Sequence, residues 1–154
     1  MKKVLIIGAG FLQNFMIQKA RKMGYYTLAV DADPSAIGFA FADEHEVINI
    51  IDKEACLAYA RKKQIDGVLT AATEYGVLTA SYIAQEMNLP GLEYAVAKRV
   101  KDKYLVKKCF IENHVDDFNG EAHEVDASTD IQKLAQNIHY PVVVKPCDGS
   151  GSRG

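Results

Sequence analysis

The sequence predicts an α/β fold in which a doubly wound parallel sheet is followed by part of a second domain. Up to Pro90, strand-like and helix-like patterns alternate roughly every 20 residues, as in βαβ units with right-handed crossovers. The first strand, residues 4–7, is apolar throughout and ends at Gly8, which is typical of a strand buried on both faces. Beyond Pro90 the composition changes, so we expect domains over residues 1–94 and 95–154.

The remaining elements of the first domain follow in order. A helix is expected after Gly10, because apolar side chains recur there at helical spacing: Leu12, Phe15, Met16, Ala20 and Met23. Residues 27–30, 47–51 and 66–70 are further apolar runs and predict three more strands. Asp52 is placed to cap one helix, and another helix follows the last of these strands. The apolar positions of these two helices are Cys56, Tyr59, Ala60, Val77, Ala80, Ala84 and Met87.

The second domain opens with a basic helix, predicted over residues 98–110. An acidic stretch follows over residues 112–130 and contains no lysine or arginine. A second helix is predicted over residues 129–138, because apolar residues recur there at helical spacing. Residues 141–146, which include three consecutive valines, predict one more strand, and a loop rich in glycine and serine comes after it.

Composition and charge exclude several classes of protein. Of the 154 residues, 49% are hydrophobic and 25% are charged, which excludes a disordered chain and a fibrous repeat. The net charge of −2 argues against a nucleic-acid partner, which would require a basic excess. No apolar run approaches the ~20 residues that span a bilayer, so no membrane partner is expected. The cysteines are widely spaced and form no CxxC pair, which favours a reducing cytoplasm.

Three segments are candidates for chemistry, and the first is the turn that contains Gly8 and Gly10. Asp31 follows about 20 residues later, as in a dinucleotide-binding fold, where the glycines let the backbone approach a pyrophosphate. However, Gln13 occupies the place of the third glycine, and the intervening residues are bulky. A turn between a strand and a helix also favours small residues without any ligand, and the incomplete fingerprint favours this second interpretation.

The second segment, residues 70–76, follows the fourth predicted strand. Ligands of open parallel sheets bind beyond the carboxyl ends of the strands, which makes Glu74 a candidate substrate-binding residue. The alternative is helix capping, with Thr73 as the N-cap and Glu74 in the first turn, which is favourable without a ligand. The sequence does not separate these two interpretations.

The third segment is the predicted strand that contains Lys145, together with the loop after it. A lysine at the end of a strand can hold one phosphate group while backbone N–H groups of a glycine-rich loop surround the others. The segment is not a P-loop, because the lysine precedes the glycines. The alternative is an exposed lysine beside a loose chain end, and the apolar strand argues against it. The loop residues are Gly149, Ser150, Gly151, Ser152, Arg153 and Gly154.

Taken together, these motifs resemble the N-terminal part of an ATP-grasp enzyme. The residues that carry the resemblance run across essentially the whole chain: 4–10, 29–34, 42–43, 65–68, 89–91, 102–103 and 143–146, before the glycine-rich loop. The branch that they resemble most includes the carbamoyl-phosphate synthase large subunit and many stand-alone carboxylate–amine ligases. The resemblance implies that residues 1–94 form a Rossmann-like pre-ATP-grasp domain and that residues 95–154 begin the ATP-grasp domain.

The resemblance also implies a reaction and a set of site residues. ATP would phosphorylate a carboxylate to an acyl phosphate, an amine would displace the phosphate, and Mg²⁺ would bridge the phosphate groups of ATP. By position, Lys103 and Lys145 resemble the two ATP-binding lysines of the family, and residues 149–154 resemble the loop that closes over the phosphates. Gly8, Gly10 and Glu74 would contribute to substrate binding.

The adenine-binding hinge, the metal ligands and the catalytic arginine of the family all lie further along than residue 154. The resemblance therefore implies a fragment with no catalytic or metal-binding residue of its own and no ligase activity by itself. The parent would be a cytoplasmic ligase for small-molecule carboxylate and amine substrates, and analogy with relatives suggests a homodimer. The rival hypothesis is a small Rossmann-type nucleotide-binding module that regulates without catalysis.

Overall fold

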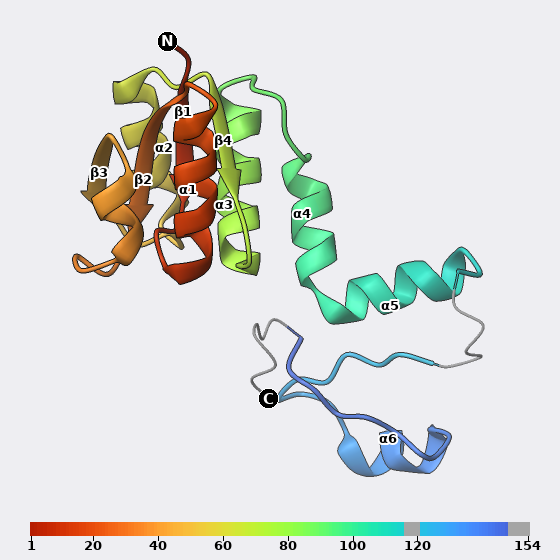
Figure 1. The fold of residues 1–154 in the computed structure, drawn as a ribbon. Coiled ribbons are helices and arrows are strands. Elements are labelled where there is room, and N and C mark those ends of the chain that lie inside the picture. The colour runs from red at the N-terminus through yellow and green to blue at the C-terminus, as the bar shows by residue number, and fades with distance from the viewer. Residues whose placement is uncertain (116–120, 148–154) are drawn as a thin grey trace. The chain divides into compact units, whose positions relative to one another are not determined.

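The structure is a computed structural model that describes residues 1–115 and 121–147 (Figure 1). The chain divides into two compact units, Met1–Ala97 and Lys98–Gly154. The elements in chain order are β1 (Lys3–Ile7), α1 (Phe11–Lys22), β2 (Tyr26–Asp31), the 3-10 helix η1 (Ile37–Phe41), β3 (Glu44–Val47), α2 (Lys53–Lys63), β4 (Gly67–Thr70), α3 (Glu74–Glu86), α4 (Tyr94–Lys101), α5 (Lys103–Glu112) and α6 (Ile131–Asn137).

The first unit is built on a parallel four-stranded sheet, which confirms the predicted fold class. The strand order is β3-β2-β1-β4, and Ile7 at the end of β1 pairs with Val30 of β2 and Thr70 of β4. Along the chain, β2 and β3 are therefore added on one side of β1, and β4 is added on its other side. This reversal makes the carboxyl ends of β1 and β4 the topological switch point, where open α/β sheets bind their ligands.

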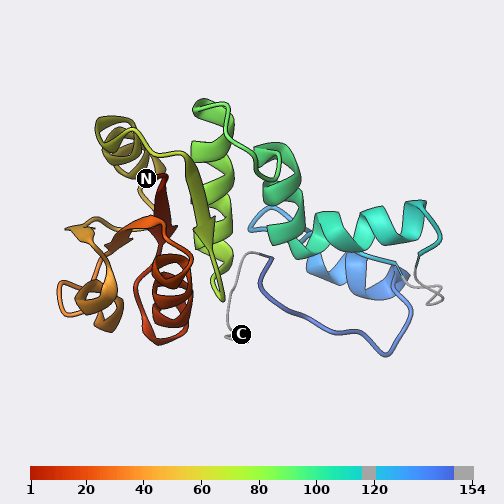
Figure 2. The same ribbon diagram turned by 45° about the horizontal axis from the view of Figure 1, so that its top comes forward.

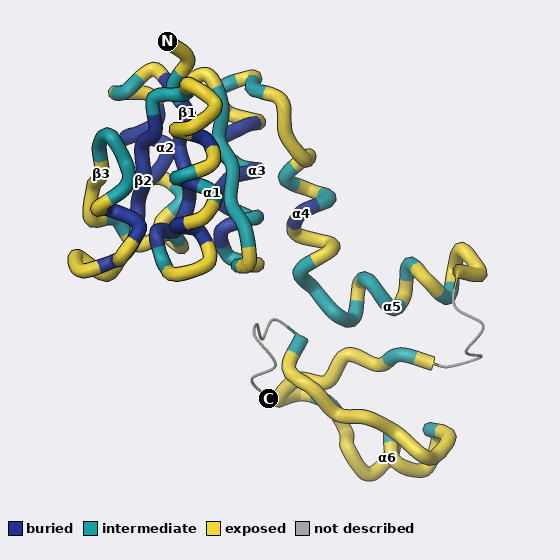
Figure 3. The backbone as a smooth tube through the Cα atoms, in the orientation of Figure 1, coloured by how far each residue is buried: buried dark blue, intermediate teal, exposed yellow. Residues whose placement is uncertain are grey.

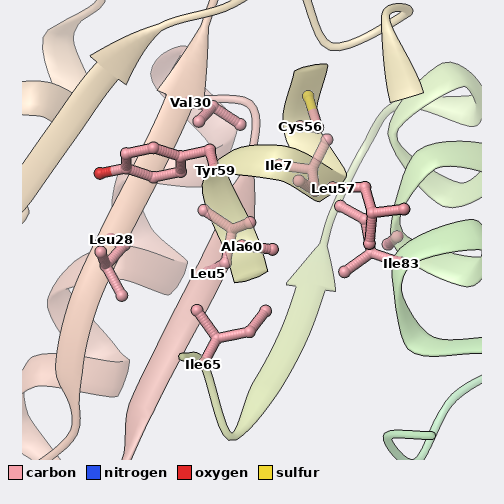
Figure 4. Packing of buried hydrophobic residues seen from close by; sticks show 11 residues of the cluster. Leu5, Ile7, Leu28, Val30, Cys56, Leu57, Tyr59, Ala60, Ile65 and Ile83 are labelled. Atoms are coloured by element: carbon pink, nitrogen blue, oxygen red, sulfur yellow. The ribbon is translucent and has the colours of Figure 1, made fainter. Parts of the chain in front are cut away.

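Helices cover both faces of this sheet (Figure 2). On one face, α2 and α3 pack on alternate residues of β1 and β2, and Figure 4 shows most of these side chains. On the other face, α1 and η1 pack on the intervening residues, including Val4, Ile6 and Ala29. Figure 3 shows the result, in which the central strands β1 and β2 are buried except at their end residues Lys3, Tyr26 and Asp31. This two-sided burial explains why the sequence of β1 is apolar at every position after Lys3.

The predicted apolar face of α1 is confirmed in part. Ala20 is buried and Met16 packs against the core, as predicted. Phe15 and Met23, by contrast, are 57% and 61% exposed, and the polar side chains of Gln13 and Asn14 are buried. The helix begins directly after the Gly8–Gly10 turn, and the side chain of Gln13 packs against that turn. Gln13, in the first turn of α1, therefore faces the glycine turn, and Phe15 faces solvent.

The third strand also differs from the prediction, since β3 spans Glu44–Val47 rather than residues 47–51. The carboxamide oxygen of Asn49 accepts a hydrogen bond from the N–H of Ile51 (3.1 Å), which turns the chain away from the sheet. Ile48 and Ile50 then pack against the core beside α2. Their apolar character reflects this packing outside the sheet, and Asp52 caps α2 as predicted by accepting from the N–H of Ala55 (3.0 Å).

In the second unit, the basic helix predicted over residues 98–110 is two helices. The carboxylate of Asp102 accepts hydrogen bonds from the N–H groups of Tyr104 (2.9 Å) and Leu105 (3.0 Å), so a new helix begins after it. The helix predicted over residues 129–138 is confirmed as α6, with Asp130 as its N-cap.

The strand predicted over residues 141–146 is absent from the described structure. A strand requires a neighbour for its backbone N–H and C=O groups, and every strand pairing in the described part of the chain involves β1 to β4. Val143 and Val144 are 84% and 93% exposed, so the three valines form an unpaired apolar segment. An apolar run such as residues 142–144 therefore does not by itself show that a strand has a partner to pair with.

Candidate functional site

The first candidate site lies where β1 ends. Gly8 has a φ of 93°, a conformation that favours glycine, and its N–H donates to the carbonyl of Val30 (2.8 Å). The N–H of Ala9 donates to Oδ2 of Asp31 (2.7 Å), which ties the turn to the end of β2. The N–H groups of Gly8 and Ala9 are therefore engaged within the protein, and so is Asp31, the acid predicted to hold a ribose. The start of α1 at Gly10 has no side-chain cap.

The side chain of Gln13 covers the glycine turn. A Cβ atom on Gly8 would lie 3.3 Å from Cδ of Gln13, and one on Gly10 would lie 3.1 Å from its Oε1. The Nε2 of Gln13 donates to the carbonyl of Ala71 (2.5 Å), beyond the end of β4. Gln13 therefore connects the two turns of the switch point. The glycines make room for this side chain, so the space that a pyrophosphate would occupy is partly filled.

The second candidate site is the turn between β4 and α3. The hydroxyl of Thr73 accepts a long hydrogen bond from the N–H of Gly76 (3.4 Å), and Glu74 is exposed in the first turn of α3. A Cβ on Gly76 would lie 2.4 Å from Oγ1 of Thr70, so the start of the helix packs tightly on β4. The capping interpretation is thus present in the structure. An exposed carboxylate at a switch point stays compatible with the ligand interpretation.

The structure brings the predicted substrate-binding residues to one edge of the sheet. Gly8 and Gly10 follow β1, Glu74 follows β4, and Gln13 bridges the two turns through Ala71. The sequence reasoning named Gln13 only as a missing glycine and did not anticipate this bridge. A long polar side chain in place of the third glycine was the available signal.

The predicted ATP-binding lysines both lie in the second unit. Lys103 is the first residue of α5, and its backbone N–H donates to the carbonyl of Cys147 (3.1 Å). This bond brings the segment that contains Lys145 to the beginning of α5, across 44 residues of sequence. Lys145 itself is exposed. The predicted loop residues, 149–154, lie outside the described part of the chain.

A separate polar cluster in the second unit centres on Glu121. Its Oε1 accepts from the N–H of His139 (3.1 Å) and lies 2.6 Å from Nδ1 of the same residue, while Oε2 lies 3.0 Å from Nε2 of His123. The hydrogen bonds from His139 and then His123 lower the pKa of Glu121 to about 2. The cluster ties the residues after α6 to the segment that precedes it.

Two further searches concern metals and membranes. Among the described residues, no group of three or more His, Cys, Asp or Glu side chains is arranged to hold a metal ion. Within residues 1–115 and 121–147, none of the helices has the length and apolar character that crossing a bilayer requires.

Comparisons with known proteins show what the chain is similar to. No protein-family model matches the chain. The formate-dependent phosphoribosylglycinamide formyltransferase of Wolinella succinogenes is 26% identical over 166 residues, which cover 99% of this chain and 39% of that protein. The propionyl-CoA carboxylase alpha chain of Ruegeria pomeroyi is 28% identical over 169 residues, which cover 99% of this chain and 24% of the relative.

Solved structures agree with these relatives. The N5-carboxyaminoimidazole ribonucleotide synthetase of Thermotoga maritima superposes with a TM-score of 0.72 and 26% identity, over 97% of this chain and 39% of that one. The phosphoribosylglycinamide synthetase of Anaerococcus prevotii gives a TM-score of 0.74 with 24% identity and the same coverage. The chain is thus similar to an N-terminal portion of ATP-grasp enzymes, as the resemblance predicted. It spans 39% of the length of the formyltransferase.

Proposed function

We propose that this chain is part of an ATP-dependent carboxylate–amine ligase. In the proposed reaction, a carboxylate oxygen attacks the γ-phosphorus of ATP and ADP leaves, which yields an acyl phosphate. The amine nitrogen then attacks the acyl carbon, the bond to phosphate breaks, and the nitrogen loses a proton as the amide forms. The similarity to ATP-grasp ligases over 99% of the chain supports this proposal.

The nucleotide site of the proposed ligase includes Lys103 and Lys145. The observation that carries this assignment is the hydrogen bond from the N–H of Lys103 to the carbonyl of Cys147, because it joins the two lysine-bearing segments. Two ammonium groups near the transferred phosphoryl group would stabilise the negative charge that develops on its oxygens. Residues 149–154 are proposed to close over the phosphates, as the resemblance implies.

Gly8, Gly10 and Glu74 are proposed to form part of the substrate site at the switch point of the sheet. The structure disfavours the rival dinucleotide site, since Asp31 is engaged by the N–H of Ala9 and Gln13 covers the glycine turn. The proposal also includes a cytoplasmic location, which the spacing of the cysteines favours, and a homodimer, which analogy with relatives suggests.

Nucleotide binding tests the assignment of the lysines. We expect ATP to shift the backbone amide signals of Lys103 and Cys147 in an NMR titration of the chain. The substitutions Lys103→Ala and Lys145→Ala should each weaken binding by about 10- to 150-fold, since a lost charged contact costs about 1.5–3 kcal/mol. Lys133→Ala, which removes an exposed lysine of α6, is the matched control and should bind ATP like the wild type.

Unchanged ATP affinity in both lysine variants would remove these residues from the site. Since the chain spans 39% of the length of the formyltransferase, we also propose that it binds ATP without completing the reaction. Phosphate release by the same samples, above the buffer background, would contradict that part of the proposal.

A further inference from the structure

We propose that Gln13 is a positioning residue for Glu74 at the switch-point edge of the first unit. Gln13 holds the turn between β4 and α3 in a strained conformation, and this turn sets where the first turn of α3 begins. The inference rests on the proposed function, because Glu74 is proposed there as a substrate-binding residue. An unusual backbone conformation and two hydrogen bonds across the edge carry the inference.

The backbone conformation of Ala72 is the first observation. Its φ is 55°, in the left-handed region that a residue with a Cβ atom disfavours. Three other non-glycine residues of the described chain have a positive φ, and each lies within two residues of the end of a helix: Gln64, Asn88 and His114. A left-handed residue is the usual end of a helix. Ala72 lies instead between β4 and the N-cap of α3, so the end of a helix does not explain it.

The side chain of Gln13 restrains the residue before Ala72. Its Nε2 donates to the carbonyl of Ala71 (2.5 Å), which lies 58 positions away in the sequence. Gln13 is 8% exposed and packs against Gly8, so its side chain has little freedom to move. The carbonyl of Ala71 and the nitrogen of Ala72 belong to one planar peptide group. A bond that fixes this carbonyl therefore fixes the group from which the φ of Ala72 is measured.

A second hydrogen bond holds the same turn at its beginning. The hydroxyl of Thr70 donates to the carbonyl of Ile7 (2.7 Å), at the end of β1. A Cβ atom on Gly76 would lie 2.4 Å from Oγ1 of Thr70, so α3 packs closely on this hydroxyl. The turn is thus tied to β1 through Thr70 and to α1 through Gln13. Surroundings that restrain a segment in this way can hold a residue in a strained conformation, and such strain is concentrated at functional sites.

The position of Glu74 depends on this turn. Thr73 is the N-cap of α3, and its hydroxyl accepts only a long hydrogen bond from the N–H of Gly76 (3.4 Å). Its carbonyl accepts from the N–H of Val77 (3.2 Å). Without the bond from Gln13, we expect Ala72 to relax out of the left-handed region and the first turn of α3 to open more often. Gln13 therefore acts on Glu74 through Ala71 and Ala72.

Hydrogen exchange of backbone amides, followed by NMR on the chain, tests this role. Gln13→Met keeps the length of the side chain and removes the donor. We expect exchange at Gly76 and Val77 to become about fivefold faster, equivalent to the roughly 1 kcal/mol that one hydrogen bond contributes. Exchange at Ala20, in the interior of α1, should stay as in the wild type, because the proposed effect is confined to the turn and the start of α3.

Gln18→Met is the matched control. The Nε2 of Gln18 donates to Oδ1 of Asn14 (2.9 Å), so this substitution removes a side-chain hydrogen bond within α1 alone. Exchange at Gly76 and Val77 should be unchanged in this variant. Equal acceleration in the two variants, or acceleration at Ala20 as well in Gln13→Met, would show a general loss of stability and overturn the positioning role.

A double-mutant cycle tests whether Gln13 holds the strain at Ala72. Ala72→Gly removes the Cβ atom that disfavours the left-handed region, so it should raise the midpoint of urea unfolding in the wild-type background. In the Gln13→Met background the increase should be smaller, because the turn has already relaxed there. An equal increase in both backgrounds would show that Gln13 does not hold Ala72.

The outcomes also distinguish this inference from the proposed function. If ATP shifts the signals of Lys103 while Gln13→Met leaves exchange at Gly76 and Val77 unchanged, the positioning role is wrong and the nucleotide site stands. If exchange at these two residues accelerates as expected and ATP shifts no signal of the second unit, Gln13 holds the turn and the nucleotide site fails instead.

Discussion

At the scale of single residues, close approach of the backbone determines the shape of the switch-point edge. The N–H of Gly38 in η1 donates to the carbonyl of Ala9 (2.7 Å), which places η1 directly on the turn after β1. A Cβ on Gly38 would lie 2.6 Å from that carbonyl oxygen and 2.8 Å from Cδ1 of Ile17. Only glycine fits there without moving the turn.

Replacing this glycine should therefore destabilise the first unit. We expect Gly38→Ala to lower the free energy of unfolding by about 1–3 kcal/mol, the usual cost of overpacking a core. Urea unfolding followed by circular dichroism measures the change.

A second glycine provides the matched control. A Cβ on Gly67 would lie 3.6 Å from Cγ1 of Val4, an ordinary contact, so Gly67→Ala should alter stability by less than about 1 kcal/mol. If Gly38→Ala is as stable as Gly67→Ala, the described packing of η1 on the turn is wrong.

At the scale of elements, aspartate caps determine where helices begin. Asp52, Asp102 and Asp130 each accept a backbone hydrogen bond at the start of α2, α5 and α6. The cap at Asp102 has the largest consequence, because it makes Lys103 the first residue of a new helix. The N–H of Lys103, at the start of α5, donates to the carbonyl of Cys147. The cap therefore helps to place one lysine-bearing segment beside the other.

The segments around α6 are joined by Glu121, and this contact predicts a pH dependence. In the folded chain the pKa of Glu121 is lowered from 4.5 to about 2, so its bonds stabilise the fold fully above about pH 4.5. The stabilisation declines as the pH falls from there towards 2. Because the side chain is exposed, solvent reduces the size of the effect.

The expected result is a difference that depends on pH. The wild type should be more stable than Glu121→Gln at pH 6, and the two should become equally stable as the pH approaches 2. Urea unfolding of both chains across this range measures the difference. A difference that is constant with pH would show that Glu121 does not form these hydrogen bonds as a carboxylate in solution.

At the scale of the whole molecule, much of the first unit is predictable from the sequence. The apolar runs of β1 and β2 and the cap at Asp52 are local signals that survive in the structure. The burial of Gln13 was not predictable from the apolar spacing of α1, because its hydrogen bond to the carbonyl of Ala71 joins residues 58 positions apart. The end of β3 at Val47 was also not predictable from the apolar run. Ile48 and Ile50 continue that run, but they pack against the core outside the sheet.

The candidate site divides in the same way. Gly8, Gly10 and Glu74 could be placed at one edge from the order of strands alone, because parallel strands end together. The contact between the segments of Lys103 and Lys145 joins residues distant in sequence and needed the structure. The strand predicted for Lys145 is wrong in the described residues, because an apolar run does not reveal whether a pairing strand is present.

A comparison of two nucleotides tests the central claim most directly. The chain is titrated in a calorimeter with ATP and, separately, with NADH. The account predicts heat of binding for ATP that is reduced in Lys103→Ala and Lys145→Ala, and none for NADH, because Gln13 and Asp31 are engaged within the protein. Binding of NADH that depends on Gly8, Gly10 and Asp31, with no binding of ATP, would contradict the account.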